Sequence, residues 1–153
     1  MKIAKIISGG QTGVDQAALD VAIALDIPHG GWIPKGRKTE NGVLPDTYRL
    51  KEMPTFSYAR RTEQNVIDSE GTLIISLGPL TGGSELTHKM AMLHDRPCLH
   101  IDLGILDPHK AVNTVRLWIA HHGIKSLNIA GPRASENPNI YDMTTKLLKA
   151  ILG

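Results

Sequence analysis

Two glycine-rich segments contain the residue types best suited to binding an anion. They are Ser8–Gly13 (SGGQTG) and Gly78–Ser84 (GPLTGGS). Glycine lets backbone N–H groups approach an oxyanion closely, and the N-terminus of a following helix adds free donors and the positive end of a helix dipole. Neither segment has the spacing of GxGxxG or of a phosphate loop ending in GK[ST]. The pattern therefore predicts a phosphate cradle without implying dinucleotide binding or NTP hydrolysis.

The loops offer side chains as well as backbone donors. The hydroxyls of Thr81 and Ser84 can add hydrogen bonds. Because a carboxylate is unsuited to a phosphate, we expect Asp15 to cap the helix or to accept from a ligand hydroxyl or ring N–H. A tight strand-to-helix turn with a capping box at Thr12–Asp15 is the alternative for the first loop. The candidates are Gly9, Gly10, Gln11, Thr12, Gly13, Asp15, Thr81, Gly82, Gly83 and Ser84.

Basic residues outside the two loops are candidates to neutralise a phosphate. Arginine suits bidentate phosphate recognition, and lysine provides a point contact. The alternatives are solvated surface charge for the basic runs and an ordinary turn at Gly131-Pro132. Of the pair Arg60-Arg61, we expect one side chain to face solvent. The further candidates are Lys35, Arg37, Arg61, Gly131 and Arg133.

Short apolar runs alternate with segments of helical period, which predicts strands and helices in alternation. Such alternation is typical of an α/β fold, a three-layer Rossmann-like, doubly wound parallel sheet of about five strands. The predicted strands are Lys2–Ile7, Thr72–Leu77, Pro97–Ile101 and Leu127–Ala130, with Gly31–Ile33 as a possible short one. The predicted helices are Val14–Leu25, Arg60–Ser69, Glu85–Leu93, Ala111–His121 and Tyr141–Ile151.

In such a sheet, ligands bind beyond the carboxyl ends of the strands, at the switch point between the two halves. We expect Lys2–Ile7 and Thr72–Leu77 to be the pair of strands at that point, because a glycine-rich loop follows each of them. Pro34–Pro54 is rich in glycine, proline and charge, and it is predicted to be a long exposed loop. A structureless loop of about 20 residues is uncommon in a compact domain and is usually functional or disordered.

Composition limits the function classes. The 153 residues fit a single domain, 1–153, and 41% hydrophobic content is normal for a globular protein with a real core. A formal charge of +2 and 4% aromatic residues argue against a nucleic-acid partner. No apolar run approaches a membrane span, and no signal-peptide pattern occurs, so we expect a cytoplasmic protein. The single cysteine, Cys98, and the lack of HxH, HExxH or CxxC patterns argue against a protein-ligated metal.

The sequence resembles the molybdenum cofactor carrier family. This resemblance implies a Rossmann-like fold, homo-oligomeric assembly as a dimer or tetramer, and binding of molybdenum cofactor, a phosphorylated pterin that carries a dithiolene-bound metal. A carrier of this kind would hand its ligand to molybdoenzymes. The matching blocks are Ser8–Asp15 (SGGQTGVD), Gly30–Arg37 (GGWIPKGR), Arg61–Val66 (RTEQNV), Gly71–Ile74 (GTLI), Thr81–Ser84 (TGGS) and Asn128–Arg133 (NIAGPR).

The family is also similar, more distantly, to the Lonely Guy (lysine-decarboxylase-like) phosphoribohydrolases, which cleave the base from ribose 5′-monophosphate. Those enzymes carry a PGGxGTxxE loop whose glutamate assists the cleavage. Here Leu80-Thr81 interrupt that loop, and Glu85 comes one turn too early to match. We therefore favour a non-catalytic carrier. The alternatives are a nucleotide N-glycosidase that uses Glu85 or Asp15 as acid or base, and a nucleotide-sensing module that acts through a partner protein.

Overall fold

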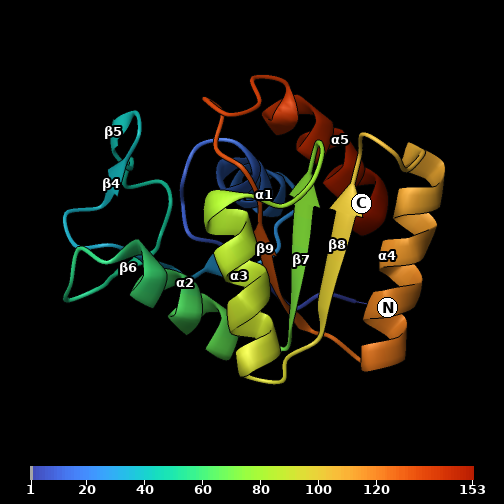
Figure 1. Cartoon of the computed structure of the whole chain (residues 1–153), viewed down its shortest axis with the longest axis horizontal. Coiled ribbons are helices and arrows are strands. Elements are labelled where there is room, and N and C mark those ends of the chain that lie inside the picture. Colours follow the sequence, from blue (N-terminus) through green and yellow to red (C-terminus); the bar gives the residue numbers. More distant parts are fainter. Residues whose placement is uncertain (1) are drawn as a thin grey trace.

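The computed structural model describes residues 2–153 and has a five-stranded parallel sheet at its centre (Figure 1). The strand order is β2-β1-β9-β7-β8, and all neighbouring pairs run parallel. This confirms the predicted α/β class and the predicted sheet. The strands are β1 (Lys5–Ile7), β2 (His29–Gly30), β7 (Gly71–Ser76), β8 (Cys98–Asp102) and β9 (Ser126–Ala130).

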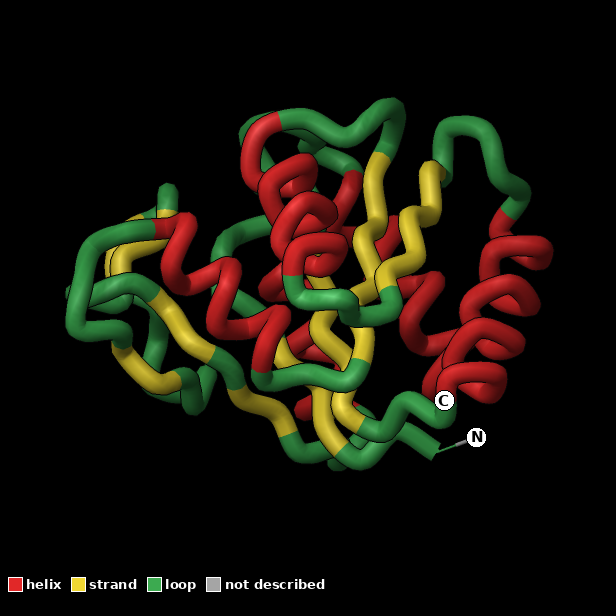
Figure 2. Tube along the Cα trace, turned by 60° about the horizontal axis from the view of Figure 1, so that its bottom comes forward, coloured by secondary structure: helices red, strands yellow, loops and turns green. Residues whose placement is uncertain are grey.

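Helices cover both faces of the sheet (Figures 1 and 2). One layer contains α1, α4 and α5, in which α5 packs against both of the others, and the opposite layer contains α2 packed against α3. No helix within residues 2–153 is both long and apolar enough to cross a membrane. The helices are α1 (Val14–Ala24), α2 (Tyr58–Ile67), α3 (Gly82–Leu93), α4 (Pro108–His122) and α5 (Ile140–Leu152).

Strand β7, which lies between β9 and β8, explains why the sheet is stable with both faces covered. All of its residues are buried, and its sequence GTLIIS is a continuous run without the alternation of a half-exposed strand, as expected for a strand covered on both faces. Leu73 and Ile75 are fully buried in the main core, where they join Val14 of α1, Val115 of α4 and Leu147 of α5. Burial of each such side chain contributes about 1.5–3 kcal/mol, so this cluster stabilises the sheet together with the layer of α1, α4 and α5.

The strand pairing at the switch point differs from the prediction. β9 lies between β1 and β7, so those two strands are not neighbours. Asn128 of β9 is in register with Ile7 on one side and with Thr72 on the other. The loops that follow β1, β9 and β7 therefore open at the same edge of the sheet, and three segments rather than two meet there.

The segment 34–54 is mostly exposed, as predicted, but it is not a structureless loop, because it contains three short strands and buried leucines. It lies to the left in Figure 1, where β4 pairs with β5 and β6 pairs with β3. Leu44 and Leu50 are buried and pack with Ile33 and with Leu19 of α1 in a second hydrophobic cluster. The short strands are β3 (Trp32–Ile33), β4 (Lys38–Thr39), β5 (Gly42–Val43) and β6 (Lys51–Glu52).

The chain leaves the main sheet at Gly31, so the short strand predicted at 31–33 does not join that sheet. It corresponds to β3, which pairs with β6. The φ of 129° at Gly31 lies in the region that favours glycine, and a Cβ at this position would lie 2.2 Å from the Ser8 carbonyl oxygen. The chain therefore turns against the first glycine loop at this point. Residues before the turn belong to β2 of the central sheet, and residues after it belong to β3 of the small sheet.

Candidate ligand-binding pocket

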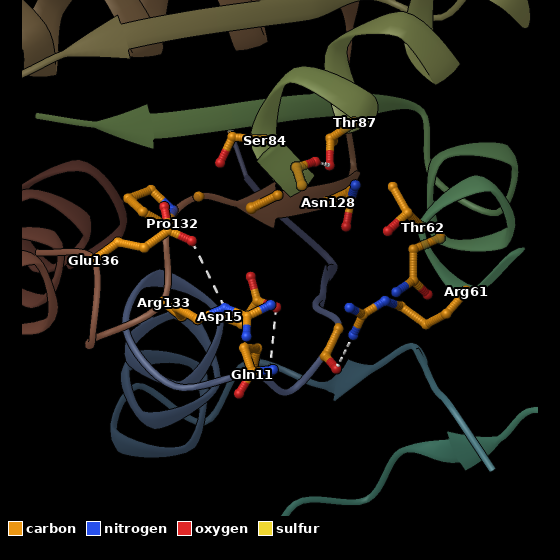
Figure 3. Close-up of a pocket in the computed structure, with 15 residues that line it drawn as sticks. Gln11, Asp15, Arg61, Thr62, Ser84, Thr87, Asn128, Pro132, Arg133 and Glu136 are labelled. Atoms are coloured by element: carbon orange, nitrogen blue, oxygen red, sulfur yellow. Dashed lines mark hydrogen bonds and ion pairs between the residues drawn. The ribbon is translucent and has the colours of Figure 1, made fainter. Parts of the chain in front are cut away.

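A polar pocket lies at the carboxyl edge of the sheet, between the loops after β1 and β9 and the N-terminal parts of α1, α2 and α3 (Figure 3). Its volume is about 70 Å³. This is several times the ~10–15 Å³ that one water requires, and it is room for a group the size of a phosphate. The lining residues are Gly9, Gln11, Asp15, Arg61, Thr62, Asn65, Gly83, Ser84, Thr87, Asn128, Ala130, Gly131, Pro132, Arg133 and Glu136.

Asp15 and Arg61 are oppositely charged residues that both line the pocket. Asp15 lies in the first turn of α1, is 7% exposed, and accepts a hydrogen bond from the Gln11 N–H at 3.2 Å. The half-buried Arg61 guanidinium donates to the Gly9 carbonyl. Burial raises the pKa of Asp15 to about 6, against the opposing pull of Arg61. Burial lowers the pKa of Arg61, but arginine stays cationic at any ordinary pH.

Neutral polar groups complete the walls. Ser84 and Asn128 are 7% and 3% exposed, and both side chains line the pocket. The Asn128 amide nitrogen donates to the Thr72 hydroxyl at 3.2 Å, and its amide oxygen faces the interior of the pocket (Figure 3). The pocket therefore presents cationic and hydroxyl donors together with carboxylate and amide acceptors. Such a mixture suits a ligand that is anionic at one end and donates hydrogen bonds elsewhere.

The second glycine loop contributes the start of α3. The first N–H groups of a helix have no intrahelical partner, and they carry the positive end of the dipole. Gly83 lines the pocket, and a Cβ built on it would have no atom within 4 Å. Thr81 is the extended residue before the helix and Gly82 is its first residue; both are exposed beside the pocket rather than lining it.

The first glycine loop differs from a simple backbone cradle. The N–H of Gly10 donates to the Ser8 hydroxyl, that of Gln11 to Asp15, and that of Thr12 to the Gln11 side chain. Positive φ angles of 79° at Gly10 and 81° at Gly13 turn these groups inward. Three of the N–H groups that were expected to bind phosphate are therefore occupied by the loop itself.

Glu40 joins the first glycine loop to the loop after β9. Its carboxylate accepts from the hydroxyls of Thr12 and Ser135 and from the Ser135 N–H, and its own N–H donates to Gln11. Gln11 lines the pocket, and so does Arg133, which lies two residues before Ser135 in the chain. By binding both Gln11 and Ser135, Glu40 links two walls of the pocket. Thr12 is thereby part of the pocket's support and does not line it.

Lys35 and Arg37 lie outside the pocket, contrary to their expected role as phosphate neutralisers. The Arg37 guanidinium donates to carbonyls of the segment 44–50, at distances between 2.9 and 3.4 Å. The Lys35 ammonium lies 5.3 Å from the centroid of the Phe56 ring. Their nearness in sequence to Gly30, Gly31 and Gly36 suggested a ligand loop, but Gly30 belongs to β2, and Gly31 and Gly36 lie before and after β3.

The structure thus brings together eight of the predicted candidates and leaves others outside. Glu85, the possible catalytic acid, is exposed and forms an ion pair with Lys89 at 3.1 Å, away from the pocket. Arg60 is exposed whereas Arg61 points inward, as expected of one member of that pair. The candidates in the pocket are Gly9, Gln11, Asp15, Arg61, Gly83, Ser84, Gly131 and Arg133. Those outside it are Gly10, Thr12, Gly13, Lys35, Arg37, Thr81 and Gly82.

Sequence reasoning missed several lining residues. Thr62 and Asn65 follow Arg61 at spacings that place all three on one side of a helix. Asn128 is a polar residue within the buried strand SLNIA, an unusual position that could have identified it. The Glu136 Oε1 atom lies 3.7 Å from the Arg133 Nε atom. No sequence pattern identifies Glu136 as a pocket residue. Within residues 2–153, no three His, Cys, Asp or Glu side chains are grouped as a metal ion would require.

Together the fold and the pocket define a Rossmann-like α/β protein with a polar pocket at the carboxyl edge of its sheet. The sequence profile of the circularly permutated YpsA SLOG family matches residues 6–152, and the chain belongs to this family. No curated protein matches the sequence.

A solved structure supports the same relationship. The chain is 56% identical to a protein from Syntrophus aciditrophicus SB that is named "Putative molybdenum carrier protein". The two structures superpose with a TM-score of 0.98 over 99% of this chain and 96% of that one. The resemblance found in the glycine-loop motifs is therefore confirmed.

Proposed function

We propose that this protein binds and carries the molybdenum cofactor or a related phosphorylated, nucleotide-like ligand. One observation carries the proposal: the Arg61 guanidinium and the N-terminus of α3 line the same small pocket at the carboxyl edge of the sheet. Ligands of open α/β sheets bind at this edge, and helix N-termini favour phosphate. The name of the Syntrophus aciditrophicus protein agrees with a molybdenum-related ligand.

In this proposal the phosphate occupies the pocket and the rest of the ligand lies at its mouth. Arg61, the Gly83 N–H and the Ser84 hydroxyl would donate to phosphate oxygens, and Arg133 would add positive charge. A volume of about 70 Å³ has room for the phosphate. Asp15 would accept from a donor on the ligand, as its raised pKa permits a shared proton near neutral pH.

Native mass spectrometry on protein isolated from cells that make molybdenum cofactor tests this proposal. We expect the wild type to retain a phosphorylated pterin or nucleotide, and Arg61→Gln to lose it. Arg60→Gln is the matched control, because Arg60 is the exposed neighbour on the same helix. Equal ligand content in wild type and Arg61→Gln, or an empty wild type, would contradict the proposal. The same spectra report the assembly state, which we propose to be homo-oligomeric.

A second candidate function is hydrolysis of a nucleotide N-glycosidic bond. The specific observation in its favour is Asp15, a buried carboxyl in the pocket whose pKa of about 6 suits a general acid or base. Water would add across the bond between ribose C1′ and the base nitrogen and give ribose 5-phosphate and free base. Chromatography of GMP incubated with the protein separates the two functions. Free guanine that disappears with Asp15→Asn would favour the enzyme over the carrier.

A further inference from the structure

The first residue of α2 is a tyrosine that lies next to the pocket without lining it. Tyr58 is 43% exposed, although an aromatic ring gains by burial. The chain has few aromatic residues, and the exposed ones within residues 2–153 are Tyr58 and Phe56, the latter 71% exposed. Both therefore lie within one short stretch beside the pocket's arginine helix.

Helix geometry places Tyr58 on the pocket side of α2. Arg61, Thr62 and Asn65 all line the pocket, and they follow Tyr58 by three, four and seven residues. Residues at these spacings share one face of a helix. Tyr58 is the N-terminal member of this face.

The direction of α2 places Tyr58 at the end of the helix that is farther from the amino edge of the sheet. α2 leads into β7, which begins at Gly71, so its C-terminus lies at the amino edge of the sheet and its N-terminus toward the carboxyl edge (Figure 1). The Tyr58 ring also contacts the arginine of the pocket, with the Arg61 Cζ 5.5 Å from the ring centroid. A ligand whose phosphate reaches Arg61 therefore comes near this ring.

We propose that the ring of Tyr58 stacks on a flat heterocycle of the ligand while the ligand's phosphate is held beside Arg61. This inference rests on the proposed function and adds a ligand class: a phosphate monoester that carries a planar heterocycle, either a purine or a pterin. Aromatic side chains stack on any such ring, because each heterocycle presents a π face. In this proposal Tyr58 is exposed because its ring must remain accessible to the ligand.

The test compares a ligand with the ring and one without it. Affinities for GMP and for ribose 5-phosphate, measured by isothermal titration calorimetry, give a ratio that isolates the contribution of the ring. We expect GMP to bind the wild type more tightly than ribose 5-phosphate. Tyr58→Leu should lower the GMP advantage by about 5- to 150-fold, the range that loss of one base–aromatic stack produces. Tyr58→Phe keeps the π face and should keep the advantage.

The outcomes separate this inference from the proposed function. If the wild type binds both probes and Tyr58→Leu leaves their ratio unchanged, the stacking role is wrong and the phosphate pocket stands. If the wild type binds neither probe, the proposed function and the stacking role both fail. A pterin phosphate monoester tested beside GMP distinguishes the two heterocycles, and loss of its affinity in Tyr58→Leu supports the stacking role equally. Unfolding curves of both variants confirm that the exposed position tolerates them.

Discussion

Asp15 is destabilising when ionised, and its replacement by asparagine should therefore stabilise the folded protein above pH 6. The carboxyl is 7% exposed, and burial raises its pKa from 3.8 to about 6. A difference of this size corresponds to roughly 3 kcal/mol. Well below pH 3.8, Asp15 is neutral in both the folded and the unfolded chain. Above pH 6 it is ionised in both, and the folded state bears the cost of the buried charge.

The sign of the effect follows from the raised pKa. The stability that neutral Asp15 contributes is fully present below pH 3.8 and is lost as the pH rises through about 6. Asp15→Asn is neutral at every pH and can still accept from the Gln11 N–H. We therefore expect the two proteins to be similarly stable at pH 4. At pH 7 the variant should be more stable by up to about 3 kcal/mol.

Urea unfolding of both proteins at several pH values from 4 to 8 measures this difference. The contributions of the other carboxyl groups cancel in the difference between the two free energies of unfolding, since both proteins contain these groups. Backbone N–H groups of Ser126 and Gly78 lower the pKa of Glu70 and of Asp102, and both groups are the same in the two proteins. A stability difference that does not change between pH 4 and 7 would refute the reasoning. A buried, destabilising carboxylate kept in a pocket is typical of a functional site.

Three further predictions concern the pocket and its support. As the pH falls from 8 to 5, affinity for ribose 5-phosphate should change more favourably in the wild type than in Asp15→Asn, because only the wild type loses the opposing charge of Asp15, whereas the ligand phosphate loses the same charge in both; calorimetry at pH 5 and 8 checks this. Gly83→Ala should raise the free energy of unfolding by about 0.5–1 kcal/mol, since it removes a helical glycine, and thermal melts measure it. The added methyl group should weaken ribose 5-phosphate binding by about tenfold, as for one lost charged hydrogen bond. Arg37→Ala should cost about 1–3 kcal/mol of stability, because the carbonyls of segment 44–50 lose their donor, with ligand affinity unchanged.

The sequence predicted the central sheet well because its signals are local. A continuous apolar strand such as β7 and helices of regular apolar period follow from neighbouring residues alone. The position of β9 between β1 and β7 could not be predicted in this way, since strand order depends on pairing between residues far apart in the chain. The segment 34–54 was missed because its cluster depends on Leu44 and Leu50, two isolated leucines among glycine, proline and charge.

The pocket was predicted in part for similar reasons. Glycine loops after strands mark the correct edge of the sheet, so Gly9, Gln11, Gly83 and Ser84 were found. Arg37 was assigned to the ligand because a phosphate and a set of backbone carbonyls both attract a guanidinium, and the sequence does not distinguish them. Asn128 lies in β9 and Glu136 in the loop that follows it, far in sequence from the first glycine loop. Only the tertiary fold brings these two residues to the pocket.

The most direct test of the pocket is an NMR titration of ¹⁵N-labelled protein with ribose 5-phosphate. The account predicts saturable shift changes at the backbone N–H groups of Gly9, Gly83 and Ser84 and at the Arg61 side chain, which all line the pocket. Saturable changes confined to the apolar groove between α4 and α5, or no saturable change anywhere, would contradict the claim that this pocket binds a phosphorylated ligand.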